Sequence, residues 1–109
     1  MLYDPAAFEP LIDEPWNEAH VRDDIAAVVA DADAAFGPEE LWPAHEWDGW
    51  QAALPMKNLY VGAAGMVFAL DDLRRRGLAE TTLDLPAAAL RALERWRAEP
   101  DYIEGEVVP

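Results

Sequence analysis

The chain has 109 residues, of which 52% are hydrophobic, and it carries a formal net charge of −14. This length predicts a single domain with a modest core, and the apolar content excludes a chain that is disordered throughout. A surface this acidic repels phosphate groups, so we expect neither nucleic-acid binding nor attachment to anionic membranes.

The chain contains no cysteine and no serine. Disulfides, thiolate and serine nucleophiles, and cysteine-based zinc sites are therefore excluded within it. The first ten residues, MLYDPAAFEP, lack the basic and apolar regions of a secretory signal, and no apolar run is long enough to span a bilayer. We therefore expect a soluble, cytoplasmic protein.

Residues 1–15 contain three evenly spaced prolines, Pro5, Pro10 and Pro15, with acidic residues between them. Proline lacks an amide donor and restricts the residue before it, so this composition predicts an extended arm. Apolar residues within the arm predict that it packs against other parts of the protein. Residues 16–109 are expected to form the helical part.

A first helix is predicted from about Trp16 to Phe36, because apolar residues recur there at helical spacing. Gly37 and Pro38 are expected to end it, with the glycine in a left-handed cap. The apolar positions of this helix are Val21, Ile25, Val28, Val29, Ala32 and Phe36.

The next segment, Leu41 to Asn58, is interrupted by two prolines and a glycine. These residues break any long helix, so we expect an irregular connection. Its three tryptophans, Trp42, Trp47 and Trp50, are expected to anchor it.

A second helix is predicted from near Val61 or Gly62 to Gly77. Much of its first half is apolar on all sides, which predicts burial on more than one face. Its last turn pairs Asp71 with Arg75 and Asp72 with Arg76 at a spacing of four residues, which favours surface ion pairs. Gly77 is well placed as the residue that follows the helix cap.

A third helix is predicted from about Asp84 to Ala98, with Asp84 as the N-cap and Pro86 in the first turn. Nothing in the chain argues for a parallel sheet, so the fold class is predicted to be all-α. The apolar stripe expected to face the core comprises Ala89, Leu90, Leu93 and Trp96.

Two glycines, Gly62 and Gly65, open the second helix in the stretch NLYVGAAGMVFAL. A phosphate-binding loop would need a further glycine or a following lysine at set spacing, and neither is present. Small residues here favour the close approach of another backbone. The alternative is that bare amides at this helix end hold an anion or a carbonyl group.

The pattern from Leu59 to Leu70, followed by Leu73 and by Arg74 to Gly77, resembles the first inner helix of lanthionine synthetase C-like proteins. In that family an aromatic-x-Gly-x-Ala-Gly motif opens each inner helix of an α/α toroid. The resemblance covers roughly Leu41 to Pro109. In the first forty residues it extends only to the general pattern of the sequence. It implies that this chain is the N-terminal helical part of such a toroid.

The resemblance also implies a function. Members of the family are zinc enzymes that add thiols to dehydrated serine or threonine residues of peptides, and their zinc is held by two cysteines and a histidine in the later part of the toroid. Because this chain has no cysteine, we expect no cofactor and no catalytic residue within it. It is expected to be a scaffold fragment, with a degenerate relative as the alternative; the ending EGEVVP resembles the lead-in to a further inner helix.

Five residues are candidates for contact with a peptide substrate: His45, Trp47, Tyr60, Gly62 and Gly65. For His45, a buried side chain hydrogen-bonded to the backbone is expected more often than a role as a ligand. Tyr60 is expected either to line the cavity of the parent enzyme or to pack against neighbouring residues. The expected partners are the remainder of the toroid or a second copy of the chain, because an uncovered apolar face favours association.

Two other functions remain open from the sequence. One is a small acidic helical module that binds a protein or peptide through its Trp-rich segment, without enzymatic activity. The other is a piece of a different α/α toroid, such as a sugar-processing enzyme, which would carry a pair of catalytic carboxylates.

Overall fold

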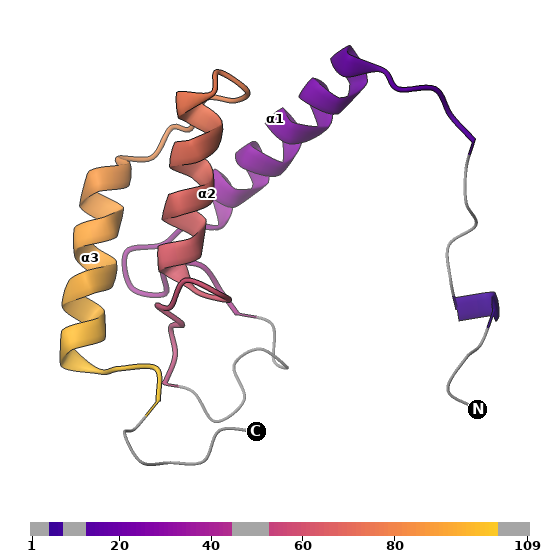
Figure 1. Ribbon diagram of the computed structural model, residues 1–109. Coiled ribbons are helices and arrows are strands. Elements are labelled where there is room, and N and C mark those ends of the chain that lie inside the picture. Colours follow the sequence, from indigo (N-terminus) through magenta and orange to yellow (C-terminus); the bar gives the residue numbers. More distant parts are fainter. Residues whose placement is uncertain (1–4, 8–12, 45–52, 103–109) are drawn as a thin grey trace.

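A computed structural model describes residues 5–7, 13–44 and 53–102 (Figure 1). These residues form three α-helices, α1 (Glu18–Ala35), α2 (Ala63–Arg75) and α3 (Leu85–Ala98), and one short 3-10 turn, η1 (Pro5–Ala7). The described ranges contain no β-strand, only an isolated bridge between Gly37 and Leu41. The predicted all-α class is therefore confirmed, whereas the toroid stays a prediction.

Helices α2 and α3 pack side by side as an antiparallel pair, and α1 projects away from them (Figure 1). Helix α1 contributes Val29 and Ala32, both in its second half, to the buried core.

Local signals fix the ends of α2 and α3 as the sequence predicts. The Asp84 carboxylate accepts a hydrogen bond from the Ala87 amide at the start of α3. After α2, Gly77 has a φ of 70°, and the amides of Gly77 and Leu78 donate to the carbonyls of Arg74 and Leu73. This pair of bonds is a Schellman motif, which requires a left-handed residue and so favours glycine.

Helix α1 differs from the expected helix at both ends. It begins after Asn17, whose side chain accepts a hydrogen bond from the His20 amide. It ends at Ala35, and the predicted left-handed cap at Gly37 is wrong, because Phe36 leaves the helix in an extended conformation and Gly37 has no positive φ. The chain reverses in a turn instead, where Gly37 and Leu41 exchange two backbone hydrogen bonds of 2.8 and 2.7 Å.

Trp42 joins this turn to the end of α1. Its indole nitrogen donates to the Ala32 carbonyl at 2.8 Å, so it satisfies a carbonyl in the last turn of the helix that would otherwise lack a partner. The Trp42 ring also packs against Phe36, with centroids 4.8 Å apart. The predicted anchoring role of Trp42 is confirmed; Trp47 and Trp50 lie outside the described residues.

The core lies where the end of α1, the Trp42 turn and one side of the α2–α3 pair meet. Many of its members are small or medium-sized side chains, so the helices approach closely. The buried cluster comprises Val29, Ala32, Leu41, Trp42, Ala63, Leu70, Leu85, Ala88 and Ala92.

The predicted apolar stripe of α3 is wrong in its orientation. Leu90, Leu93 and Trp96 are exposed, whereas Ala88 and Ala92 face the core. The small alanine side chains let α3 lie close to its neighbours, whereas Leu90, Leu93 and Trp96 stay exposed. On α1, Val28 is likewise exposed although its spacing predicts burial.

Of the predicted extended arm, the structure describes Pro5–Ala7 and residues 13–15, the latter without regular secondary structure. Pro5–Ala7 is a 3-10 turn, and both that turn and residues 13–17 are exposed. The larger apolar residues on which the predicted packing of the arm depends lie outside the described residues, so that packing stays a prediction. Residues 1–4 and 8–12 lie outside the described part.

Asp33 connects α1 to the loop between α2 and α3. Partial burial acts to raise the pKa of the Asp33 carboxyl, but hydrogen bonds from the Thr81 hydroxyl, the Thr82 amide and the Thr82 hydroxyl outweigh it, so the pKa lies below its ordinary value. These bonds measure 2.6, 2.8 and 3.2 Å. The ionised carboxylate therefore stabilises the attachment of α1.

We predict that Asp33→Asn lowers the free energy of unfolding at pH 7 by about 1 kcal/mol, because the charged acceptor is lost. A depressed pKa in the folded state adds stability that is present above the unfolded pKa of about 3.9 and is lost as the pH falls further. The difference between wild type and variant, measured by urea unfolding, should therefore shrink below about pH 4. The exposed Asp31→Asn variant is the control, and an equal loss in both variants would contradict this assignment.

Candidate functional site: a buried carboxylate and an apolar groove

The glycine-rich start of α2 is closed by the backbone that precedes it. The first three amides of the helix, those of Ala63, Ala64 and Gly65, donate to the carbonyls of residues 56, 57 and 58 at 3.0, 3.1 and 3.4 Å. These are the amides that a helix normally leaves without partners. The alternative that bare amides here hold an anion is therefore wrong, and the carbonyls that they bind belong to the chain itself.

Gly62 and Gly65 allow the preceding backbone to come this close to the start of α2. A Cβ atom at Gly62 would lie 2.5 Å from the Asn58 nitrogen and 2.7 Å from the Lys57 nitrogen, and one at Gly65 would overlap the Leu59 carbonyl. Because these neighbours are backbone atoms, they cannot turn aside. The predicted packing role of Gly62 and Gly65 is confirmed, and their predicted contact with a substrate stays a prediction.

A buried carboxylate holds the 57–59 backbone in place. Asp101, which is 1% exposed, accepts hydrogen bonds from the Lys57 and Asn58 amides and from the Asn58 side chain at 2.8–3.0 Å. The Lys57 ammonium, also buried, lies 3.0 Å from the same carboxylate. The Asp101 carbonyl accepts in turn from the Ala53 amide at 2.8 Å. We call this set of bonds the Asp101 clamp.

Each polar side-chain atom in the clamp has at least one partner. The Lys57 ammonium also donates to the Ala53 carbonyl at 3.3 Å, and the Asn58 side-chain oxygen accepts from the Val61 amide at 2.8 Å. Among the described residues, no buried side-chain nitrogen or oxygen is without a partner. A buried ion pair is stable only when such extra hydrogen bonds offset its desolvation, and the clamp meets this condition.

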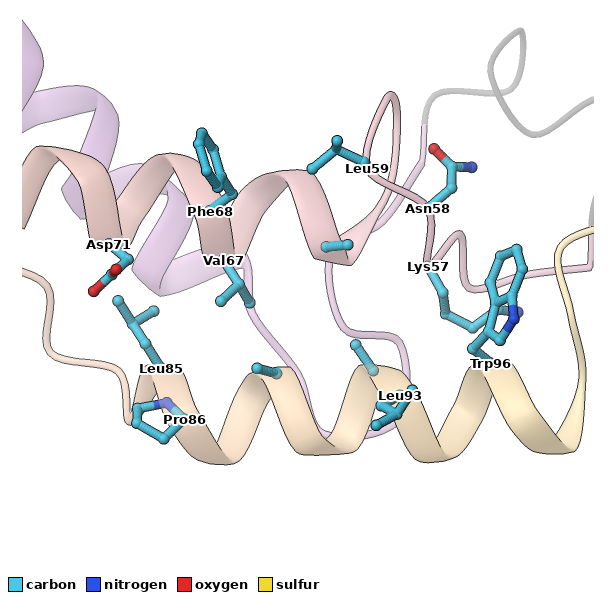
Figure 2. A pocket seen from close by; sticks show the side chains of 13 residues that line it. Lys57, Asn58, Leu59, Val67, Phe68, Asp71, Leu85, Pro86, Leu93 and Trp96 are labelled. Carbon is cyan, nitrogen blue, oxygen red and sulfur yellow. The ribbon is translucent and has the colours of Figure 1, made fainter.

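An apolar groove of about 740 Å³ lies between α2 and α3 (Figure 2). Its rims carry the exposed side chains of Leu59 and Phe68 on one side and of Leu93 and Trp96 on the other. The groove's full lining is Lys57, Asn58, Leu59, Ala64, Val67, Phe68, Asp71, Leu85, Pro86, Ala89, Ala92, Leu93 and Trp96. No residue of α1 lines it, so α1 covers only the core side of the α2–α3 pair.

The charged groups at the groove already have partners within the chain. Lys57 is neutralised by Asp101, and Asp71 lies 2.7 Å from the Arg74 guanidinium. The predicted ion pair of Asp72 and Arg76 forms at 3.0 Å. The groove therefore presents apolar surface without an unpaired charge, which is suited to apolar helices rather than to an ionic ligand.

Of the remaining predicted site residues, the structure describes Tyr60. Tyr60 is 95% exposed and does not line the groove. His45 and Trp47 lie outside the described residues, as does the ending EGEVVP. Trp42 is buried with its indole bonded to α1, so it is not available to a partner of the Trp-rich segment.

The part of the chain that the structure describes holds no group of three or more His, Asp or Glu side chains arranged to bind a metal ion. Within the same ranges, no helix is both long and apolar enough to cross a membrane. The zinc ligands that the family resemblance implies do not fit this chain, because it lacks cysteine altogether.

Sequence reasoning missed Lys57 and Asp101 as a pair. They are 44 residues apart, and neither lies on a helix, so no periodicity connects them. Asp101 follows Pro100 just after α3, where an acidic residue usually signals only an exposed turn. Comparison of the chain with protein-family models, with curated protein sequences and with solved structures finds no match.

We predict that Gly65→Ala lowers the free energy of unfolding by about 1–3 kcal/mol, because the new methyl group would overlap the Leu59 carbonyl. The higher helix propensity of alanine, worth about 1 kcal/mol, offsets only part of this loss. Gly37→Ala is the matched control, since nothing lies within 4 Å of its added Cβ. Urea unfolding measures both, and a Gly65→Ala variant as stable as the wild type would refute the close approach.

We predict that Asp101→Asn destabilises the protein by about 3–5 kcal/mol, since it leaves the buried Lys57 ammonium without a counter-charge. Asp72→Asn, which removes an exposed ion pair, should lose at most about 1 kcal/mol. The double variant Asp101→Asn with Lys57→Met should lose less than the sum of the single losses, because the partner charge is removed too. Additive losses in thermal or urea unfolding would show that the two residues do not act as a pair.

Proposed function

We propose that this chain is an N-terminal scaffold segment of a lanthionine synthetase C-like enzyme that adds thiols to dehydrated serine or threonine residues of peptides. Residues 16–109 supply helices of the α/α toroid and part of its wall. The chain itself carries no catalytic residue in this proposal. The zinc and its ligands belong to the remainder of the enzyme.

The observation that carries the proposal is the apolar groove between α2 and α3. One side of the helical pair is covered by α1 and the Trp42 turn, whereas the other leaves Phe68 and Trp96 in solvent. Helical pairs of a repeating assembly bury such a side against the next pair, and lack a complete core without it. An uncovered apolar groove is thus the expected state of one helical pair taken alone.

The opening of α2 gives a second line of support. In the family motif, glycines and small residues follow an aromatic residue, and here Gly62 and Gly65 let the 57–59 backbone close the helix end. Tyr60 stands outside the packed region, where it is free to face a cavity that other helices complete. The geometry explains why the motif needs these residue types at this spacing.

The rival proposal is a small acidic interaction module without enzymatic activity. It is favoured by the same groove, whose volume lies within the usual range of ligand sites. The two proposals differ in what the groove binds: helices of a toroid in the first case, and an unrelated partner in the second.

The test is reconstitution of a truncated enzyme. A lanthionine synthetase C-like enzyme lacking its own N-terminal segment would be produced with this chain, and a peptide with one dehydroalanine and one cysteine would be the substrate. Ring formation consumes the thiol, so alkylation followed by mass spectrometry reports it. We predict activity only when the chain is present, with at least a tenfold loss for Phe68→Glu.

Val28→Glu is the matched control, because Val28 is as exposed as Phe68 (66% against 68%) but lies on α1, outside the groove. It should leave the reconstituted activity unchanged. A truncated enzyme that stays inactive with the chain, or is equally active without it, would contradict the scaffold role and favour the interaction module.

A further inference from the structure

We propose that two copies of the 109-residue chain associate groove to groove, with two-fold symmetry, through the α2–α3 pair. The inference concerns the same groove as the proposed function, and it names the occupant that the groove takes when toroid helices do not cover it. Three features of the described residues support a second copy as that occupant: the exposed area, the distribution of charge and the arrangement of the rims.

The exposed area is sufficient for a specific interface. Leu59, Phe68, Leu93 and Trp96 are 65%, 68%, 45% and 40% exposed. With side chains of this size, the exposed parts of these four residues together amount to roughly 500 Å² per copy. Complete burial of these parts in both copies removes about 1,000 Å² from solvent, which is the lower limit for a specific protein–protein interface.

The charge of the chain is divided unevenly. Residues 53–102 hold seven of the eight basic side chains and seven acidic ones, so this part is formally neutral and the net charge of −14 falls on the remainder. Neutral α2–α3 pairs approach each other without the repulsion that the acidic α1 would cause, and α1 does not line the groove. The copies therefore meet through the one helical region that carries no net charge.

The same feature argues against a charged partner. A cationic peptide would find Asp71 already paired with Arg74 and Asp101 already paired with Lys57. For an acidic peptide, the Lys57 ammonium is buried and already paired with the Asp101 carboxylate. Neither gains an ion pair in the groove, whereas a second copy brings apolar rims that need none.

The arrangement of the rims permits a closed dimer. Phe68 lies on α2, and Leu93 and Trp96 lie on the antiparallel α3, so both helices contribute apolar residues to the groove (Figure 2). Two such pairs laid face to face form four helices around one apolar centre, as in a four-helix bundle. A two-fold axis places the same groove on both copies, so no uncovered groove is left for further growth.

The test is the molar mass of the 109-residue chain in solution, measured by light scattering after size exclusion at about 100 μM. We expect twice the chain mass of 12.1 kDa, and at least a tenfold weaker association for Phe68→Glu and for Leu93→Glu. Val28→Glu adds the same charge at an equally exposed apolar position on α1 and should leave the dimer intact. Circular dichroism checks that each variant keeps its helices, and both groove positions are exposed, so neither change enters the core.

A monomeric wild type would overturn this inference, as would equal dissociation by Val28→Glu or open-ended growth of the assembly with concentration. The result is independent of the reconstitution experiment. A monomer leaves the scaffold role standing if the truncated enzyme is restored, and a dimer that restores no activity refutes the scaffold role alone.

Discussion

The structure depends on one buried carboxylate. Asp101 binds two successive backbone amides and the ammonium group of Lys57, and so determines where the backbone before α2 runs. Once that backbone is fixed, its carbonyls face the first amides of α2, and only glycine fits at the two positions that it touches. Asp101, three residues after the end of α3, thereby positions the start of α2. It connects the last residues of the helical pair to the first.

A glycine-rich helix start usually combines close packing with free amides, and this arrangement keeps only the close packing. Such an end is often an anion site, because its amides are free. Here the first amides donate to carbonyls of the same chain, and the glycines allow the preceding backbone to come close. What remains available for function is the apolar groove beside the helix end, a surface suited to other helices. The α2–α3 pair thus has two different sides, one packed against α1 and the Trp42 turn and the other forming the apolar groove.

The sequence predicts those features that depend on a few neighbouring residues. The cap at Asp84, the left-handed Gly77 and the surface pair of Asp72 and Arg76 all follow from interactions within one or two turns of helix. The all-α class follows from the same helical periodicity.

The features that sequence reasoning missed depend on contacts between distant segments. The inward face of α3 is set by how closely its alanines pack, which periodicity does not reveal, since Leu90 and Trp96 fit a helical stripe equally well. The bond of Asp33 to Thr81 and the pairing of Lys57 with Asp101 each connect segments more than 40 residues apart. The sequence predicts an uncovered apolar face on the second helix. It does not predict that residues of α3 line the same groove.

Amide hydrogen exchange at the start of α2 tests the central claim most directly. If the clamp and the preceding carbonyls close this helix end, the amides of Lys57, Ala63 and Ala64 should exchange almost as slowly as the most protected core amides. Exchange of Ala63 and Ala64 at the rate of an open helix terminus, with Lys57 equally unprotected, would contradict the account and restore the free helix end that the sequence allows.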